Sequence, residues 1–415
     1  MRVLWLSACA PARYTQGVKV IGGWQDSVES IVSREKSVKL AVVFPVSKDV
    51  ESKIENGVYY CPMYTHLLWY EKLKVKTSAY VFIEKQLKKA LEVIEEFNPN
   101  VIQVFGTEFG YGLIAKYTKI PVVVHIQGAM IPYDNANYPP GYNGYTYFKA
   151  VKGNPLRLLN HYILSKFRDS RVRMEKEVWR YVNHYMGRTE WDKAVSGVMH
   201  PDRTYFHVEE ALRPVFLSGK YNWMPPKDGK IRLVSTGCST LWKGPDMMLK
   251  TAKILKQIGV EFEWNVCGHM PNEHRMIVEY HEGISFRETE INILGMTPPD
   301  QLADLLCHST IYVHTSYIDN SPNSICEAQC IGIPIISTNV GGISSLIHNG
   351  IDGILVPAND PYQMAFQIVT LCSDTKRLRE LSESAKAKAM ERHRSENILV
   401  QLKSCYSSII KHSSQ

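Results

Sequence analysis

The residues best suited to chemistry are two carboxylates that flank a predicted turn between a strand and a helix. Asp319 and Glu327 have seven residues between them. Ser321 and Pro322 are typical of an N-cap followed by proline at the first helical position. The free amides of such a helix start favour anionic or hydroxyl-rich ligands. The segment at this helix start is Asn320, Ser321, Pro322, Asn323 and Ser324. The alternative is a pair of solvated acids beside a capped helix.

A cation follows an earlier predicted strand in the same half of the chain. Lys243 comes shortly after Gly237 and Cys238, at the start of a predicted helix. An ammonium beside glycine backbone suits the neutralisation of a diphosphate, although a lysine at a helix start can also be merely solvated. Lys243 and the two carboxylates together predict a crevice for a phosphorylated, hydroxyl-rich ligand.

The first half of the chain carries further polar residues at predicted strand ends. Gly22 and Gly23 follow the first strand and permit close approach of the backbone to a phosphate or a sugar. His125 and Gln127 are two positions apart at the end of another strand, so they share a face. His125 faces either the cleft or the core, and Gln127 can hydrogen-bond a hydroxyl but cannot act as a base near neutral pH.

Two more features follow strand ends on the same side of the sheet. Glu108 either hydrogen-bonds a hydroxyl of a second substrate or caps a helix. Residues 131–148 contain five tyrosines, Tyr133 and Tyr142 among them, and we expect little regular structure there. This segment is either a plain surface loop or a contact for the second substrate.

The elements that must position these residues alternate between short apolar runs and longer helical patterns. The strands are predicted at residues 3–6, 38–44, 101–105 and 122–126, then at residues 232–235, 263–267, 291–294, 311–314 and 335–337. This alternation is typical of a parallel sheet covered by helices on both faces. Because it occurs twice, we expect an α/β protein with two doubly wound, Rossmann-like domains that face a cleft.

A stretch rich in proline, glycine and lysine separates the two halves. We place the first domain at residues 1–217, an exposed linker at 218–230 and the second domain at 231–395. A last amphipathic helix at 396–415 either caps the second sheet or returns to the first domain as a brace.

The region from Asp319 to Glu327 resembles glycosyltransferase family 4, which has the GT-B fold. The family carries two glutamates with this spacing, and Asp319 stands where the first is expected. The later runs Gly332 to Ile343 and Asn349 to Pro357 match the family closely, and the resemblance is strong over residues 231–360. It implies that Glu327 binds the ribose of a sugar nucleotide, and that Asp319 and the amides after it bind the sugar.

The resemblance also assigns roles elsewhere in the chain. Lys243 would stabilise the departing diphosphate, but Cys238 stands where the family usually has arginine. We expect Arg188, at the end of a first-domain strand, to substitute for that arginine. Gly22, Gly23 and Gly237 would approach the donor, and Glu108, Tyr133 and Tyr142 the acceptor. Candidates for the reaction itself are Lys243, Asp319, Glu327, Gln127 and His125, where Gln127 stands in place of a common histidine.

Composition narrows the class of protein. The 415 residues carry a net charge of +7, too mild for a dedicated nucleic-acid binder, and no apolar run is long enough to span a membrane. Nine scattered cysteines are typical of reduced, cytosolic thiols. The segment from Arg157 to Arg180 predicts an amphipathic basic helix that either rests on anionic lipid or is an ordinary solvated helix.

The resemblance implies a retaining glycosyltransferase that needs neither a metal nor a cofactor. It would move a sugar from a UDP- or GDP-sugar to a glycan or lipid-linked acceptor in cell-surface polysaccharide biosynthesis. We expect it in the cytoplasm, at the inner face of the plasma membrane. The alternatives are a nucleotide-sugar epimerase or hydrolase on the same scaffold, and a sugar-nucleotide-binding subunit without turnover.

Overall fold

The first domain is built on an eight-stranded sheet in the order β3-β4-β2-β1-β5-β6-β7-β8. A computed structural model describes residues 1–14 and 23–413. All neighbouring strands are parallel except β3 and β4. The neighbouring strands β5 and β6 are buried from end to end, as is typical of a parallel sheet covered on both faces. The strands are β1 (Arg2–Leu6), β2 (Lys39–Val46), β3 (Lys53–Glu55), β4 (Val58–Tyr64), β5 (Val101–Phe105), β6 (Val122–His125), β7 (His184–Gly187) and β8 (Thr204–His207).

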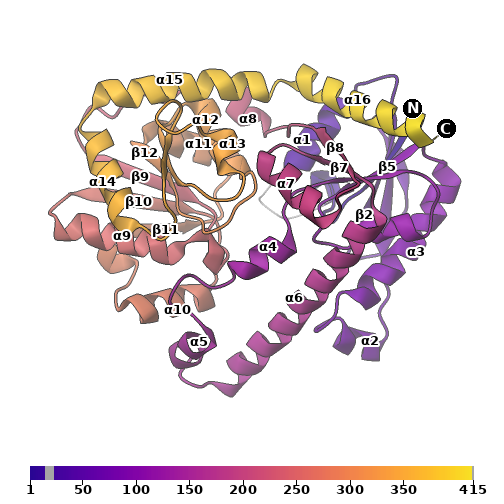
Figure 1. Cartoon of the computed structure of the whole chain (residues 1–415), viewed down its shortest axis with the longest axis horizontal. Coiled ribbons are helices and arrows are strands. Elements are labelled where there is room, and N and C mark those ends of the chain that lie inside the picture. Colours follow the sequence, from indigo (N-terminus) through magenta and orange to yellow (C-terminus); the bar gives the residue numbers. More distant parts are fainter. Residues whose placement is uncertain (15–22, 414–415) are drawn as a thin grey trace.

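Helices cover both faces of this sheet (Figure 1). The helices of this half of the chain are η1 (Ala12–Tyr14), α1 (Trp24–Val32), α2 (Trp69–Lys74), α3 (Tyr80–Phe97), η2 (Tyr111–Lys116), α4 (Met130–Asn135), α5 (Gly144–Ala150), α6 (Pro155–Tyr181), α7 (Glu190–Met199) and α8 (Pro214–Leu217). Of these, α5 and α8 pack against the second domain instead. Two core clusters lie on opposite sides of the sheet, with Leu4 in one and Val3 in the other. Alternate side chains of one strand therefore supply both cores.

The second domain has a six-stranded sheet in the order β11-β10-β9-β12-β13-β14, parallel throughout. Its strands are β9 (Ile231–Thr236), β10 (Phe262–Cys267), β11 (Ile291–Gly295), β12 (Ile311–His314), β13 (Ile335–Thr338) and β14 (Ile354–Val356). Its helices are η3 (Leu241–Lys243), α9 (Pro245–Gln257), α10 (Asn272–Glu282), η4 (Arg287–Thr289), α11 (Pro299–His308), α12 (Asn323–Ile331), α13 (Ile343–Leu346), α14 (Pro361–Cys372) and α15 (Thr375–Arg392). The expected fold of two Rossmann-like domains is confirmed.

The last helix, α16 (Ser395–Ser413), leaves the second domain and lies on the first (Figure 1). Its buried residues Ile398, Leu402 and Tyr406 share a core cluster with Trp5, whose indole N–H donates to the Tyr406 hydroxyl at 3.1 Å. Of the two placements expected for this helix, the structure has the brace.

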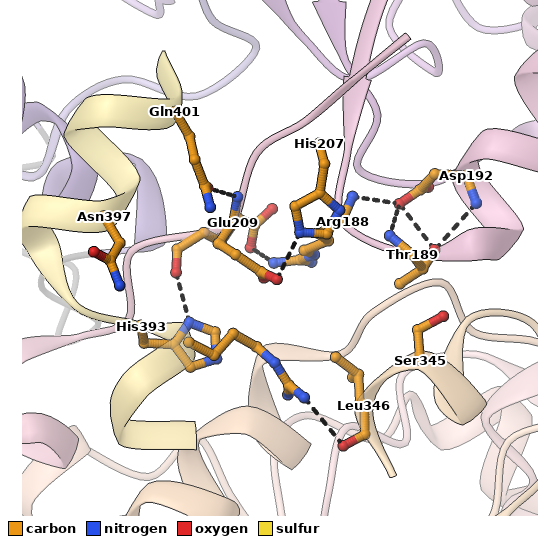
Figure 2. Close-up of polar contacts among 12 residues, drawn as sticks. Arg188, Thr189, Asp192, His207, Glu209, Ser345, Leu346, His393, Asn397 and Gln401 are labelled. Carbon is orange, nitrogen blue, oxygen red and sulfur yellow. Dashed lines mark hydrogen bonds and ion pairs between the residues drawn. The ribbon is translucent and has the colours of Figure 1, made fainter. Parts of the chain in front are cut away.

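The two chain crossings between the domains lie side by side. Nδ1 of His393, just before α16, is 2.8 Å from the Glu210 carbonyl oxygen, and the Glu209 N–H donates to the Gln401 side chain at 2.8 Å. Figure 2 shows His393 beside Glu209 at this junction. The segment after α8 is less exposed than expected, because Trp223 is buried and its indole N–H donates to the Ser309 carbonyl.

The tyrosine-rich segment 131–148 corrects one expectation. Instead of an irregular loop it contains part of α4 and of α5, where Asn143 caps α5 by accepting from the Tyr145 and Thr146 N–H groups. Two of its tyrosines, Tyr142 and Tyr147, pack against α10 of the second domain. The ring centroid of Tyr142 lies 4.0 Å from that of His281. Burial of these rings across the domains orders a segment whose local sequence does not.

Candidate functional site

Lys243 and Asp319 form an ion pair at the carboxyl edge of the second sheet. Strands β9 and β12 are neighbours, so the turns that follow them meet, and Lys243 Nζ lies 2.5 Å from Asp319 Oδ2. The connection is tight at Gly244, which has φ of 70° and where a Cβ would lie 2.0 Å from the Thr315 carbonyl oxygen. Parallel pairing and this close backbone approach therefore fix the distance between the two charges.

The Asp319 carboxylate is held in its charged form. Burial opposes ionisation, but Lys243 and His314, whose Nε2 lies 3.2 Å away, together hold the pKa of Asp319 well below its usual range. Burial lowers the pKa of His314, and Asp319 acts against that change. Asp319 can thus accept hydrogen bonds at any physiological pH.

Glu327, on α12, is buried and paired with an arginine from the segment that leaves the first domain. Arg213 donates from Nε and Nη2 to the two carboxylate oxygens, each at 2.7 Å. Burial raises the pKa of Glu327, and Arg213 lowers it in turn. α12 begins at Asn323 with Pro322 at its N-cap, so the expectation of Ser321 as N-cap was off by one residue, because Pro322 is still extended.

The loop before α12 touches the first domain directly. The Thr189 hydroxyl donates to the Asn320 side-chain oxygen at 3.0 Å, and the Asn320 amide donates to the Gln127 carbonyl at 3.3 Å. Nearby, the Glu190 N–H donates to the Ser345 hydroxyl at 3.0 Å. Figure 2 shows Thr189 of the first domain facing Ser345, which lies in α13. The carboxyl edges of the two sheets therefore meet at the residues expected to bind a donor.

Arg188 lies at this meeting point but is already engaged. Its guanidinium forms a buried ion pair with Glu210 and donates to the Ser321 carbonyl at 2.5 Å and to the Asn323 side chain at 3.0 Å. Arg188 thereby holds the loop before α12 against the first domain. A phosphate contact would require it to exchange one of these partners. Cys238, where the family has arginine, is buried in the core of the second domain.

The predicted first-domain residues surround the same edge. His125 is buried with its ring 5.6 Å from that of Trp24, and neither ring nitrogen has a hydrogen-bond partner in the part of the chain that the structure describes. Burial, and then the charge of Arg188, lower the pKa of His125 to about 3, so the ring is neutral. Gly23 is the N-cap of α1. Gly22 lies outside the residues that the structure describes.

The acceptor candidates separate into two groups. The Glu108 carboxylate lies against Gly106, and burial raises its pKa to about 7. The Tyr133 ring lies between Trp191 and Trp242, with centroids 6.2 and 5.7 Å away, so it stands in the gap between the domains. Tyr142 is buried among second-domain residues instead, where its hydroxyl donates to Glu282 at 2.8 Å.

A cavity of about 250 Å³ opens at the carboxyl ends of β1 and β5. Its walls include the rings of Trp5, Trp24 and Phe105 and the carboxylates of Asp26 and Glu29. Aromatic faces beside hydrogen-bond acceptors suit a compact, hydroxyl-rich ring.

Several site residues were not predicted from the sequence. Arg213, Trp191, Trp242 and Thr189 all contact the predicted residues. Thr189 carries a readable signal, because Thr-x-x-Asp before α7 forms a capping box. Arg213 and the two tryptophans carry no such local signal, since their partners come from other parts of the chain.

Known proteins match the second domain most clearly. Residues 230–374 match the family model "Glycosyl transferases group 1", which confirms the resemblance to glycosyltransferases. N-acetyl-alpha-D-glucosaminyl L-malate synthase from Bacillus anthracis is 30% identical over 29% of this chain and 32% of its own length. The amylovoran biosynthesis glycosyltransferase AmsK from Erwinia amylovora is 25% identical over 34% of this chain and 36% of its own. The matches thus span about a third of these relatives.

The fold is shared over the whole chain. The structure of HepE from Anabaena, in complex with UDP-glucose, superposes with a TM-score of 0.68 over 98% of this chain and 100% of that one, at 15% identity. At that identity the likeness establishes the GT-B fold.

Proposed function

We propose that this chain is a retaining glycosyltransferase that transfers a sugar from a nucleoside diphosphate donor to a glycan or lipid-linked acceptor. The observation that carries the proposal is the pairing of Lys243 with Asp319 at the start of α12, opposite the first domain, within residues that match the glycosyltransferase family model. HepE was crystallised with UDP-glucose, which favours a UDP-sugar donor over a GDP-sugar.

The donor would lie along the carboxyl edge of the second sheet. Glu327 would accept the ribose hydroxyls, because a carboxylate has about four lone-pair positions and Arg213 uses two of them. Arg213 is then a positioning residue that fixes the orientation of the carboxylate. Gly237, which is exposed and has φ of 75°, offers the diphosphate a close approach to backbone.

The sugar would bind between Asp319 and the loop that follows it. Asp319 would accept hydrogen bonds from its hydroxyls, and the amides of residues 320–324 would donate to it. Tyr133 stands at this place in the structure: burial raises the pKa of Tyr133, and the Asn320 N–H, which donates to its hydroxyl, acts in the opposite direction. Donor binding would therefore displace the Tyr133 hydroxyl.

Catalysis would rest on positioning and on charge. As the bond from the anomeric carbon to the diphosphate breaks, Lys243 and the positive end of α12 would stabilise the departing oxygens. The acceptor hydroxyl would attack on the face from which the diphosphate leaves, and its proton would pass to a departing phosphate oxygen. Such same-face attack retains the anomeric configuration and needs no protein nucleophile and no metal.

The acceptor would enter from the first domain. The cavity bounded by Trp5, Trp24 and Phe105 lies beside His125, which stacks edge-on against Trp24. Neutral His125 would donate or accept one hydrogen bond, and Gln127 would contribute a second. The name of the AmsK relative favours a polysaccharide as the product.

The test is a donor screen followed by a transfer assay. A bound donor raises the melting temperature by mass action, so UDP- and GDP-sugars are compared by thermal shift. The stabilising donor is then incubated with candidate acceptors, and products are identified by mass spectrometry and NMR. A new α-glycoside from an α-linked donor supports the proposal. An epimer, free sugar in every reaction, or binding without any product would refute transfer.

A further inference from the structure

A short segment of the first domain exposes an unusual number of apolar side chains. Residues 68–76, here called the α2 knob, include Trp69, which is 77% exposed, and Leu73, which is 58% exposed. Leu68 and Tyr70 are exposed as well. Trp69 and Leu73 are four positions apart, so they share one face of α2. The knob thus presents apolar side chains to solvent that do not pack in the core.

The exposed charged side chains of the α2 knob are all positive. Glu71 is the only acidic residue between positions 56 and 83. It is buried, lies 2.6 Å from Lys85 Nζ, and accepts from the Leu68 N–H at 2.7 Å. Lys72, Lys74 and Lys76 are exposed. Since Lys85 neutralises the one acid, three cations remain around the apolar face.

Helix α6, which contacts the chain just after the knob, carries further exposed cations. The start of α3 is fixed to α6, where the Ala79 N–H donates to the Ser170 hydroxyl at 3.0 Å and the Tyr80 hydroxyl donates to Glu177 at 2.7 Å. Arg173 and Lys176, on the same stretch of α6, are exposed. In Figure 1, α2 lies at the lower side of the first domain, away from α16.

Other cations of α6 are directed inward. Arg168 pairs with Asp134 at 2.8 Å, and the Arg171 guanidinium donates to the Glu108 carbonyl at 2.9 Å. The basic character expected for residues 157–180 is therefore divided between structural contacts and the surface beside α2.

We propose that the α2 knob docks on an anionic lipid bilayer. Tryptophan and leucine on a short helix, with lysines around them, are the side chains that enter the headgroup region of a membrane. Each lysine near an anionic surface contributes about 1 kcal/mol of attraction. An anionic bilayer complements the knob in two ways: its acyl region accepts the apolar side chains, and its headgroups attract the lysines. No helix of residues 23–413 is long and apolar enough to cross a membrane, so this contact would be peripheral.

The docking does not depend on the proposed transfer reaction. Vesicle binding needs neither donor nor acceptor, so it can succeed where the sugar-transfer assay fails, and the reverse. If both hold, the knob would bring the first-domain cavity to a lipid-linked acceptor.

The test is flotation of the full chain with vesicles of phosphatidylcholine, with and without phosphatidylglycerol. We expect the protein to float with the anionic vesicles only. Trp69→Ser with Leu73→Ser should weaken that binding at least about tenfold. The matched control is Tyr362→Ser with Phe366→Ser, which also removes two exposed side chains four positions apart, 74% and 61% exposed on α14. That control should bind as the parent does.

A second pair of variants tests the charge. Reversing Lys72, Lys74 and Lys76 to glutamate should abolish flotation, whereas reversing the exposed Lys227, Lys230 and Lys376 should leave it within about twofold. Circular dichroism melts verify that each variant folds. Absence of flotation with anionic vesicles would overturn the proposal and leave a protein partner as the occupant. Flotation that survives both knob variants would overturn it too, as would equal losses in knob and control variants.

Discussion

Arg213 and Glu327 are joined by two hydrogen bonds of 2.7 Å although they are 114 positions apart in the chain. The pair connects the segment that leaves the first domain to α12, which carries the second carboxylate of the candidate site. Its geometry is the planar, two-point contact that only arginine can make with a carboxylate. The conformation of the segment that leaves the first domain therefore determines how the Glu327 carboxylate is oriented.

Replacing Arg213 by alanine should destabilise the fold and weaken donor binding. Glu327 would be left buried without its partner, and loss of one member of a buried pair costs about 3 kcal/mol. Chemical denaturation measures the stability, and titration calorimetry with UDP measures the binding. Adding Glu327→Gln to Arg213→Ala should restore most of the stability but not the UDP affinity. An Arg213→Ala variant with unchanged stability would show that the pair is solvated and contributes little.

Lys243→Gln should weaken UDP binding by about one to two orders of magnitude, because a charge-assisted hydrogen bond contributes about 1.5 to 3 kcal/mol. Lys250→Gln is a closely matched control. Lys250 pairs with the buried Asp246, and its side chain is 24% exposed, the same as that of Lys243. Both variants should lose comparable stability, but only Lys243→Gln should lose affinity in calorimetry. Equal UDP affinities in the two variants would remove Lys243 from the donor site.

Glu108 should make stability depend on pH in a defined direction. Its pKa in the folded protein is about 7, raised chiefly by burial, whereas an unfolded glutamate ionises near 4.5. The group therefore favours the fold below about pH 4.5, and this contribution is lost as the pH rises toward 7. Glutamine does not ionise, so Glu108→Gln lacks this pH-dependent destabilisation. Between pH 5 and pH 8 its free energy of unfolding should rise relative to the parent by about 1 to 3 kcal/mol, and its melting temperature should rise with it.

The control for that experiment is Glu190→Gln, since the Glu190 side chain is 83% exposed. Its melting temperature relative to the parent should not change with pH. A Glu108→Gln curve parallel to that of the parent would place the Glu108 carboxylate in water.

Local sequence predicted the elements of the fold well and their long-range partners poorly. Strand β5 has the bounds that its apolar run predicted, because burial on both faces favours a continuous apolar segment. The Lys243–Asp319 contact follows from the same reasoning, since parallel neighbouring strands bring their turns together. These predictions needed only periodicity and topology.

The remaining features depend on packing between segments that are distant in the chain. Tyr142 and Tyr147 are ordered by their contacts with α10, and no local pattern in the sequence indicates those contacts. Arg188 was expected to meet phosphate because its position at a strand end is compatible with that role. Its actual partner, Glu210, comes from the interdomain crossing, and no spacing in the sequence indicates that contact.

Tyr133→Phe should tighten donor binding. The Tyr133 hydroxyl accepts from the Asn320 N–H at the place where the proposed donor sugar would bind, so the donor must break that contact. A neutral hydrogen bond contributes about 1 kcal/mol, which corresponds to about a fivefold gain in affinity for the UDP-sugar. The ring itself remains between Trp191 and Trp242, so the fold should be unchanged. Calorimetry with UDP-glucose and with UDP separates the effects: the gain should appear with the sugar nucleotide and be absent with UDP alone. Weaker binding of UDP-glucose to the variant would instead make the Tyr133 hydroxyl a contact of the bound sugar.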